Sequence, residues 1–248
     1  MRIRLEVEYD GTRYSGWQRQ KNGRSIQQML EKSVGRVTGT ESAVHGSGRT
    51  DAGVHALAQV AHFDTESELA PERFASALNY YLPDDIRVIR SEAAPPDFHS
   101  RFDALGKTYV YTYRNHPQRS ALHRGLSAPL QGDIDLEAMR RGAEYLLGEH
   151  DFASFCANAE GKDTVREIRQ IGIERREPYI QIVITGSGFL HHMVRIIVGT
   201  LAMVGRGEIL PEEIGRILEA KDRREAGPTA PAAGLLLKKV YYPEPVFA

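Results

Sequence analysis

A loop rich in glycine separates two short apolar segments in the first half of this chain. It reads Gly46-Ser-Gly-Arg-Thr-Asp-Ala-Gly-Val-His55 and contains one carboxylate, Asp51, with Arg49 two residues before it. Glycine lets the main chain turn sharply and lets a ligand approach closely, and arginine is suited to gripping an anion. From the residues alone, two interpretations stay open: a loop that carries a reacting group, and an ordinary solvated turn between two strands.

The segments around this loop follow the patterns of strands and helices. Apolar residues on alternate positions from Ile3 to Tyr9 predict a strand with one buried face. Ser25 is typical of a helix N-cap, and Gly39 can end the helix that follows it. Similar patterns predict strands over residues 42–45, 58–64, 86–89, 107–113, 164–174, 179–185 and 234–241, and helices over 72–82, 136–147, 189–204 and 211–220.

The order of these elements predicts an α/β (α+β) fold made of two halves. We expect an N-terminal half over residues 1–104, which carries the glycine loop, and a C-terminal half over 105–248. Each half has the element order of a split β-α-β unit, the ferredoxin-like or RRM-like arrangement, in which mainly antiparallel strands carry helices on one face. Two such sheets could join edge to edge and leave a central cleft for an active site.

The composition excludes several classes of protein. With 248 residues, of which 41% are hydrophobic, the chain can bury a core without covalent staples. Its one cysteine, Cys156, rules out a disulfide within the chain and fits a reducing cytoplasm. We expect no signal peptide and no membrane span, because no apolar run approaches the roughly 20 residues that cross a bilayer. The formal net charge of -1 leaves any nucleic-acid binding to local basic clusters.

Two such clusters are present. The first lies in one loop with Tyr14 and Trp17 and consists of Arg13, Arg19, Lys21 and Arg24. The second consists of Arg114, His116, Arg119, His123 and Arg124. Basic side chains neutralise phosphates, and exposed aromatic rings stack on bases. The alternative is a charged surface loop with Trp17 folded back into the core, and net charge does not separate the two.

Five motifs in order give the chain a resemblance to a known family. They are Asp10-Gly-Thr-Arg-Tyr-Ser-Gly-Trp-Gln18, Arg49-Thr-Asp-Ala-Gly-Val-His55, Lys107-Thr-Tyr109, Gly188-Phe-Leu-His-His-Met-Val-Arg-Ile-Ile-Val-Gly199 and Gly234-Leu-Leu-Leu237. Their order and spacing are similar to those of the tRNA pseudouridine synthase A family over nearly the full length. The resemblance implies an isomerase, without a cofactor or a metal, that acts on uridines 38 to 40 of the tRNA anticodon stem-loop. It also implies a homodimer and no nucleotide cofactor.

In such an enzyme the uracil is detached at its N1–C1′ bond, rotated and rejoined through C5, and the resemblance implies that Asp51 is the nucleophile. A carboxylate can capture the positive character that develops at C1′. Attack at C6 of the base, or removal of a proton from the sugar, stays open. A stacked nucleotide hides its glycosidic bond, so this chemistry requires base flipping.

The resemblance also assigns partners to Asp51. It implies that Arg195 pairs with the carboxylate, which agrees with the apolar residues on either side of this arginine in the sequence. Tyr109 would stack on the detached base and could relay a proton, whereas Tyr111 and Tyr113 are interpreted as packing residues. Arg49 becomes a candidate for contacting phosphate or aiding base extrusion. Leu236 would pack on the target nucleotide.

Three other classes of function compete with the synthase. A metal hydrolase could draw on Asp51 and a set of histidines, His45, His55, His62, His191 and His192, but the chain has no HExxH motif. A non-catalytic RNA-binding module would not need Asp51 together with Arg195. A phosphate-binding GxxxxGK[ST] loop is absent from the sequence, which disfavours the use of nucleoside triphosphates.

Overall fold

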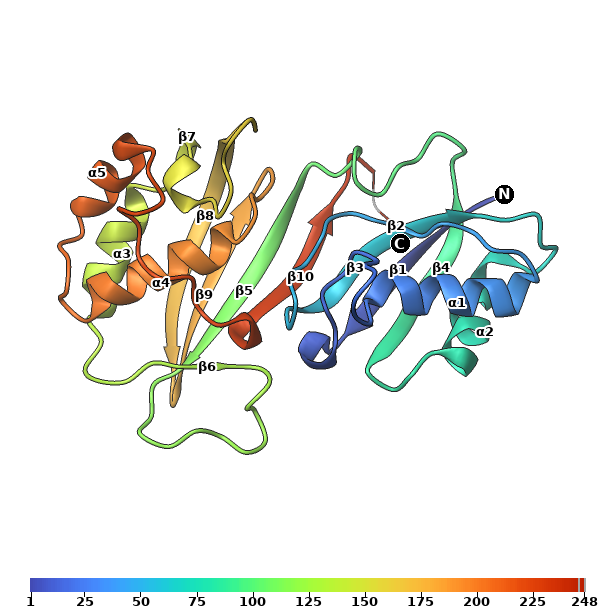
Figure 1. Ribbon diagram of the computed structural model, residues 1–248, viewed down its shortest axis with the longest axis horizontal. Helices are drawn as coiled ribbons and strands as arrows, with labels where there is room; N and C mark the ends of the chain where they lie inside the picture. The colour runs from blue at the N-terminus through green and yellow to red at the C-terminus, as the bar shows by residue number, and fades with distance from the viewer. Residues whose placement is uncertain (245, 248) are drawn as a thin grey trace. The chain divides into compact units, whose positions relative to one another are not determined.

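The computed structural model describes residues 1–244 and 246–247 and divides the chain into two compact units (Figure 1). The first unit comprises residues 1–105 and the segment that starts at residue 236, and the second comprises residues 106–235. The two units differ from the two predicted halves in the place of the last strand, which belongs to the first unit. This strand, expected in the C-terminal half, pairs in parallel with a strand of the first unit, with Leu236 opposite His55 and Leu237 opposite Ala56.

The first unit is an open sheet with two helices on one face (Figure 1). Its strand order is β4-β1-β3-β10, and β2 pairs with β3. Strand β1 is antiparallel to both neighbours, whereas β10 is parallel to β3, with Leu236 opposite His55. The elements are β1 (Arg2–Tyr9), α1 (Ile26–Thr38), β2 (His45–Gly46), β3 (His55–Asp64), α2 (Phe74–Tyr81), β4 (Ile86–Ala94) and β10 (Leu235–Tyr241), with short 3-10 turns at Gly11–Arg13 and Pro71–Arg73.

Local sequence signals account for the start of this unit. Ile3, Leu5 and Val7 are fully buried under the helices, as their alternation predicts. The Ser25 hydroxyl accepts a hydrogen bond from the Gln28 N–H at 3.2 Å and so caps α1. The predicted strand and helix are both confirmed.

The second unit has its own open, antiparallel sheet with the strand order β5-β9-β8-β7, and the short β6 pairs with β5. Helix α3 is tied to this sheet by Arg140, whose Nη2 donates to the Ile173 carbonyl at 2.9 Å. The elements are β5 (Gly106–Arg114), β6 (Ala128–Pro129), α3 (Leu136–Glu144), β7 (Gly148–Asp151), β8 (Val165–Arg176), β9 (Tyr179–Gly186), α4 (Met193–Gly205) and α5 (Glu213–Ala220), with 3-10 turns at Ala153–Phe155 and Ala232–Gly234.

The fold class predicted from the sequence is confirmed: each unit is mixed α/β, and its sheet is open and mostly antiparallel. Several boundaries differ. The helix expected from residue 189 begins at Met193, because His192 takes a left-handed conformation with φ 62°. The strand expected at 42–45 is instead His45–Gly46, and β7 was missed because its sequence, Gly-Glu-His-Asp, has no apolar alternation. The ferredoxin-like comparison, the joining of the sheets and the central cleft stay predictions.

Among the described residues, no helix combines the length and the apolar character needed to cross a bilayer.

Three histidine rings are in contact in the first unit: His45 stacks on His62, and His99 meets His62 edge to face. The ring centroid of His62, on β3, lies 5.1 Å from that of His45 and 4.8 Å from that of His99. The Nδ1 atom of His62 accepts a hydrogen bond from the Ser100 N–H at 3.2 Å. Burial lowers the pKa of His62 to about 4, and the neighbouring His99 and His45 add to the shift. His62 is therefore neutral in the folded protein at pH 7.

We expect this histidine to weaken the fold in acid. In the unfolded chain, a histidine titrates near its ordinary pKa of 6.5. Between that pH and about 4, the unfolded chain therefore binds a proton at this residue and the folded protein does not. Its contribution is fully present above pH 6.5 and is lost as the pH falls towards 4. Thermal unfolding at pH 7 and at about pH 4.5 should show a smaller acid loss in His62→Gln than in the wild type. His116→Gln, which changes an exposed histidine, is the control; an unchanged acid loss in His62→Gln would contradict the assignment.

Candidate active site

Asp51 lies in the loop that connects β2 to β3, and its side chain is half-buried. The Val54 N–H donates to the Asp51 carbonyl at 3.2 Å, which closes a turn around the residue. Gln59 of β3 holds the start of the loop. Its side chain accepts a hydrogen bond from the Ser47 hydroxyl and donates one to the Gly48 carbonyl at 3.1 Å. Asp51 is thus presented by a short loop whose two ends are fixed to β3.

A second segment, residues 10–18, packs directly against this loop. The Trp17 N–H donates to the Thr50 carbonyl at 3.1 Å, and the Gly53 N–H donates to the Tyr14 carbonyl at 3.3 Å. A Cβ atom on Gly16 would lie 2.5 Å from the Thr50 oxygen, so only glycine allows the two main chains to approach this closely. Residues on both sides of Asp51 are therefore bonded to the first loop of the chain.

Trp17 is buried in this contact and is only 2% exposed. Its indole ring lies against Gly46, where an added Cβ would sit 2.4 Å from the tryptophan Cε2 atom. The centroids of the Trp17 and Tyr9 rings lie 6.2 Å apart. Tyr14 is also buried, at 4% exposure. The interpretation of these two rings as exposed stacking platforms is wrong, and the alternative, in which Trp17 folds back into the core, is correct. The space left by Gly46 is the physical reason.

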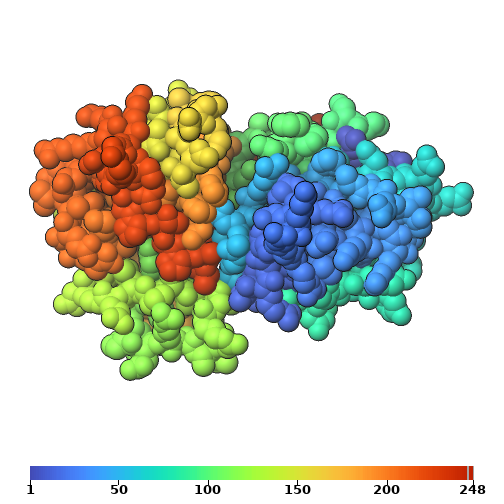
Figure 2. Space-filling model, viewed as in Figure 1, coloured from blue at the N-terminus to red at the C-terminus, as the bar shows by residue number. Residues whose placement is uncertain are grey.

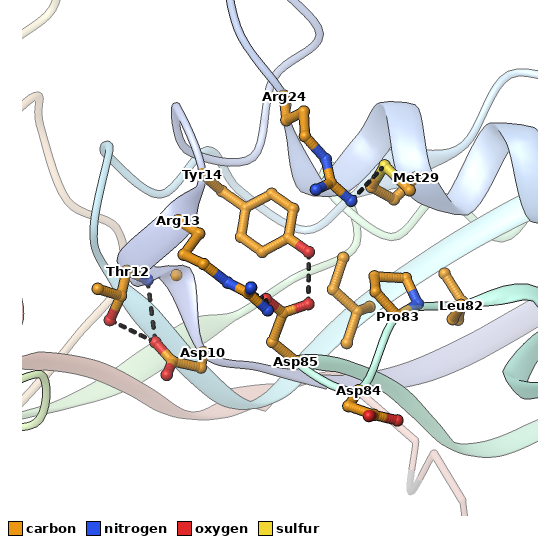
Figure 3. A network of polar contacts seen from close by, with 12 residues as sticks. Asp10, Thr12, Arg13, Tyr14, Arg24, Met29, Leu82, Pro83, Asp84 and Asp85 are labelled. Carbon is orange, nitrogen blue, oxygen red and sulfur yellow. Dashed lines mark hydrogen bonds and ion pairs between the residues drawn. The ribbon is translucent and has the colours of Figure 1, made fainter.

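The basic residues beside these rings are exposed, and two of them form ion pairs within the chain; Figure 3 shows the pair of Arg13 with Asp85. Arg13 donates from Nε and Nη2 to Asp85, which also accepts a hydrogen bond from the Tyr14 hydroxyl. Arg19 pairs with Glu31 at 3.2 Å. Burial and the neighbouring carboxylate raise the pKa of Tyr14, so its hydroxyl stays protonated and donates.

The other two cations of this loop have different surroundings. The Arg24 guanidinium lies 5.6 Å from the centre of the Tyr14 ring, and Lys21 is exposed. Arg49, beside the catalytic candidate, is also exposed. The carboxylate partners of Arg13 and Arg19 are mostly buried, with 12% of the Asp85 side chain and 14% of the Glu31 side chain exposed, so a phosphate that takes over either arginine leaves a carboxylate without that partner.

Tyr109 and Arg195 both belong to the second unit. Tyr109 lies on β5 opposite Ile184 of β9, and its buried ring meets the edge of Phe189 with centroids 5.1 Å apart. Arg195 is half-buried in α4. Its Nε donates to the Ala230 carbonyl at 2.7 Å, and the Ala230 N–H donates to the Arg195 carbonyl at 3.0 Å. This two-way contact fixes the orientation of the guanidinium.

The two other tyrosines of β5 are packing residues, as expected. Tyr111 is fully buried, and its hydroxyl donates to the Pro231 carbonyl at 2.8 Å. Tyr113 is nearly so, and its hydroxyl donates to the Val198 carbonyl of α4 at 3.2 Å. Burial raises the pKa of both phenols, which keeps them neutral in the core.

Two residues at the loop were not assigned a role from the sequence. The Nδ1 atom of His55 lies 3.1 Å from Asp10 Oδ1 and accepts a hydrogen bond from the Gly11 N–H at 3.2 Å. Burial tends to raise the pKa of Asp10, but hydrogen bonds from Thr12 and the interaction with His55 outweigh it and lower the pKa. His55 therefore joins the end of the Asp51 loop to the first loop. Its place in the motif was the signal that could have shown this.

The histidines of the first unit do not form the metal site of the alternative hypothesis. His45 and His62 stack on each other, while His55 faces Asp10. Leu236, the candidate for packing on the nucleotide, is half-buried on β10 directly opposite His55. The first unit thus carries Asp51, Arg49 and Leu236 around one loop, and the second carries Tyr109 and Arg195.

Comparison with known proteins decides the family. A family model described as tRNA pseudouridine synthase matches residues 6–103 and 143–243, well over half of the chain. The chain belongs to the tRNA pseudouridine synthase family.

Its relatives in this family are similar over nearly the whole length. A tRNA pseudouridine synthase A 2 of Clostridium tetani is 47% identical over 243 residues, covering 97% of this chain and 98% of the relative. A tRNA pseudouridine synthase A of Acetivibrio thermocellus is 46% identical over 241 residues and covers 97% and 99% respectively. One from Geobacter is 46% identical over 244 residues and covers 98% and 99%. The family is one of isomerases, as the resemblance implied, and Asp51, Arg195 and Leu236 lie within the matched segments.

Gly46→Ala should loosen the Asp51 loop, because the new Cβ overlaps the buried ring of Trp17. Trp17 is the single tryptophan of the chain, so its fluorescence reports this contact alone. We expect the emission to shift to the red and the unfolding free energy to fall by about 1–3 kcal/mol in chemical denaturation. In Gly35→Ala, the control, the new Cβ has its nearest neighbour at 3.8 Å and lies within α1, so the emission should stay at the wild-type position and the unfolding free energy should not fall. Wild-type emission in Gly46→Ala would show that the indole does not depend on Gly46.

Proposed function

We propose that this member of the family converts uridine to pseudouridine at positions 38 to 40 of the tRNA anticodon stem-loop. The main observation in favour is that Asp51 of the Arg49–His55 motif lies on a loop braced from two sides in a chain that belongs to the family. Cleavage of a glycosidic bond needs a carboxylate held in a defined place, because a reacting group that is misplaced by an ångström loses much of its effect.

In the proposed reaction Asp51 is the nucleophile. If the carboxylate attacks C1′, the electron pair of the N1–C1′ bond leaves with the uracil. The detached uracil then rotates, C5 forms a bond to C1′ and the carboxylate is released. The proton on C5 is lost to a base, and N1 gains a proton, so that the product is an isomer of the starting uridine. Attack at C6 and removal of a sugar proton are the other two routes, and each also needs Asp51 in its ionised form. No cofactor or metal takes part in any of the three routes as proposed.

Arg195 is proposed as the cation that pairs with the carboxylate of Asp51. A half-buried guanidinium among the buried residues of α4 is a stable arrangement only when it has polar partners, and one of them is the Ala230 carbonyl. Tyr109 is proposed as the aromatic face against which the detached uracil lies, with its hydroxyl able to relay a proton.

Recognition of the RNA is proposed to combine base flipping with phosphate contacts. Extruding a stacked nucleotide typically costs a few kcal/mol, and contacts from basic side chains offset it. Arg49 is exposed next to Asp51 and would contact the extruded strand, while Leu236 would pack on the target nucleotide. The further phosphate contacts would come from the exposed basic side chains of the first loop, Arg13, Arg19, Lys21 and Arg24.

The working form is proposed to be a cytoplasmic homodimer. One chain has a net charge of only -1, so a single copy offers a modest basic surface to an elongated polyanion. Two copies could hold one tRNA, with one contacting the body of the RNA while the other presents Asp51 to the target uridine.

Asp51→Ala should abolish the reaction while the fold is retained. We expect pseudouridine formation on an unmodified tRNA transcript to fall by at least about 10³-fold, since the nucleophile itself is removed. Transcripts with a single uridine at position 38, 39 or 40 would show which positions are modified. Asp84→Ala removes an exposed carboxylate near the first loop and is the matched control. Residual activity of Asp51→Ala near the level of this control would rule out the nucleophile assignment.

Arg195→Met should separate catalysis from binding. We expect turnover to be lost, because Asp51 would lack its cation, while the affinity for tRNA stays within about threefold of wild type. Arg206→Met, at the end of the same helix, removes an arginine that pairs with Glu208 and serves as the control. Equal losses of binding and turnover in Arg195→Met would instead make Arg195 a structural residue or an RNA contact.

A further inference from the structure

The acidic and basic residues of the chain are unevenly distributed. The whole sequence contains 33 acidic and 32 basic residues, yet no Asp or Glu occurs between Asp103 and Asp133. The same stretch contains Lys107, Arg114, Arg119 and Arg124, together with His116 and His123. It lies in the interval between the two segments matched by the family model, so the match assigns it no role.

Two of the four Lys and Arg side chains, together with both histidines, lie on one closed loop of the second unit, residues 115–127. The loop leaves β5 after Arg114 and returns at Ala128, which pairs with Tyr113 of the same strand, so its two ends lie side by side. It extends beyond the ends of β5 and β6 in Figure 1, and its atoms, coloured light green, lie at the surface in Figure 2. Compact loops with closed ends are frequently functional.

Hydrogen bonds give the 115–127 loop a defined shape. The Arg114 Nε donates to the Gln118 carbonyl at 2.9 Å, and the Ser127 hydroxyl donates to the His123 carbonyl at 3.0 Å. His123 Nδ1 also lies 2.9 Å from the Tyr179 hydroxyl of β9. These bonds hold the main chain of the loop at Gln118 and His123 and link the loop to β9.

The arginines of the loop differ from those of the first loop in their partners. Arg13 and Arg19 each pair with a carboxylate. Across residues 1–244 and 246–247, no ion pair joins Arg114, Arg119 or Arg124 to an acidic side chain. Arg124 donates to the Ala121 carbonyl of its own loop at 2.7 Å, and both Arg119 and Arg124 are exposed. No acidic side chain of the described residues neutralises their charge.

We infer that the 115–127 loop is a phosphate-binding arm for the RNA substrate, a contact additional to the first loop and to the Asp51 loop. Guanidinium groups bind phosphate in a bidentate manner, and here no carboxylate has to be displaced. The inference rests on the proposed function, since it takes tRNA as the polyanion. Arg119 and Arg124 would act on affinity, not on the bond-breaking step.

The test compares two double variants with the same loss of charge. Arg119→Ala/Arg124→Ala removes the two exposed arginines of the loop, and Arg176→Ala/Arg224→Ala removes two exposed arginines of the second unit that pair with Glu174 and Asp222. Binding of tRNA is measured by fluorescence anisotropy over a series of salt concentrations. For the loop variant we expect affinity to fall about tenfold or more, and the salt slope to shrink by about 1.8 for two phosphate contacts. KM should rise while kcat stays within about twofold of wild type.

Several results would overturn the inference. The first is a loop variant with the affinity and salt slope of the wild type. The second is an equal loss of affinity in both double variants, which would indicate an effect of overall charge. The third is dissociation of the oligomer in the loop variant, which would make the loop a subunit contact. Failure of the proposed function looks different, because the wild-type protein would then form no pseudouridine in any transcript. Both double variants are also made in the Asp51→Ala protein, and their tRNA affinity is measured by anisotropy. Because this protein is expected to be inactive, the comparison of binding does not depend on turnover.

Discussion

The structure of the first unit depends on the contact between the Asp51 loop and the first loop of the chain. A loop with three glycines would sample many conformations by itself, because glycine loses more freedom on ordering than other residues do. Here the Thr50 carbonyl and the Gly53 N–H are both taken up by residues 14–17, and the Trp17 indole fills the space over Gly46. Burial of this aromatic ring offsets the conformational entropy that the loop loses on ordering. The position of the Asp51 carboxylate therefore depends on the packing of a residue some 35 positions earlier in the sequence.

The last strand brings the C-terminal segment back to the same loop. Strand β10 is parallel to β3 and places Leu236 opposite His55, the residue that ends the Asp51 motif. On the other side, His55 contacts Asp10 and Gly11. Three segments that are far apart in the sequence therefore meet at one residue, and a change at the C-terminal strand acts on the loop through the backbone of β3.

The sequence predicted what local signals encode. The strand from Ile3 to Tyr9 follows from alternation, and α1 follows from a capping serine and a terminal glycine, since both depend only on neighbouring residues. The burial of Trp17 depends on Gly46 and the pairing of β10 depends on β3, and neither partner is marked by any local pattern. The ion pair of Arg13 with Asp85 could not be predicted either, because the two residues lie 72 positions apart in the sequence, with two helices between them. Of the candidate site, the motifs identified Asp51, but the residues that hold its loop emerged from packing.

The two basic loops illustrate how the same residue type can contribute differently to binding a polyanion. When Arg13 or Arg19 turns to a phosphate it gives up a carboxylate, so the gain is a difference between two similar charge-assisted contacts. Arg119 and Arg124 form no ion pair with a carboxylate of the described residues, and each phosphate they neutralise releases a counterion from the RNA. The displaced Asp85 and Glu31 would also remain beside the RNA as negative charges. For a chain with almost no net charge, the arrangement of carboxylates therefore determines which arginines draw in the RNA, and the absence of acidic residues from 104 to 132 matters as much as the presence of basic ones.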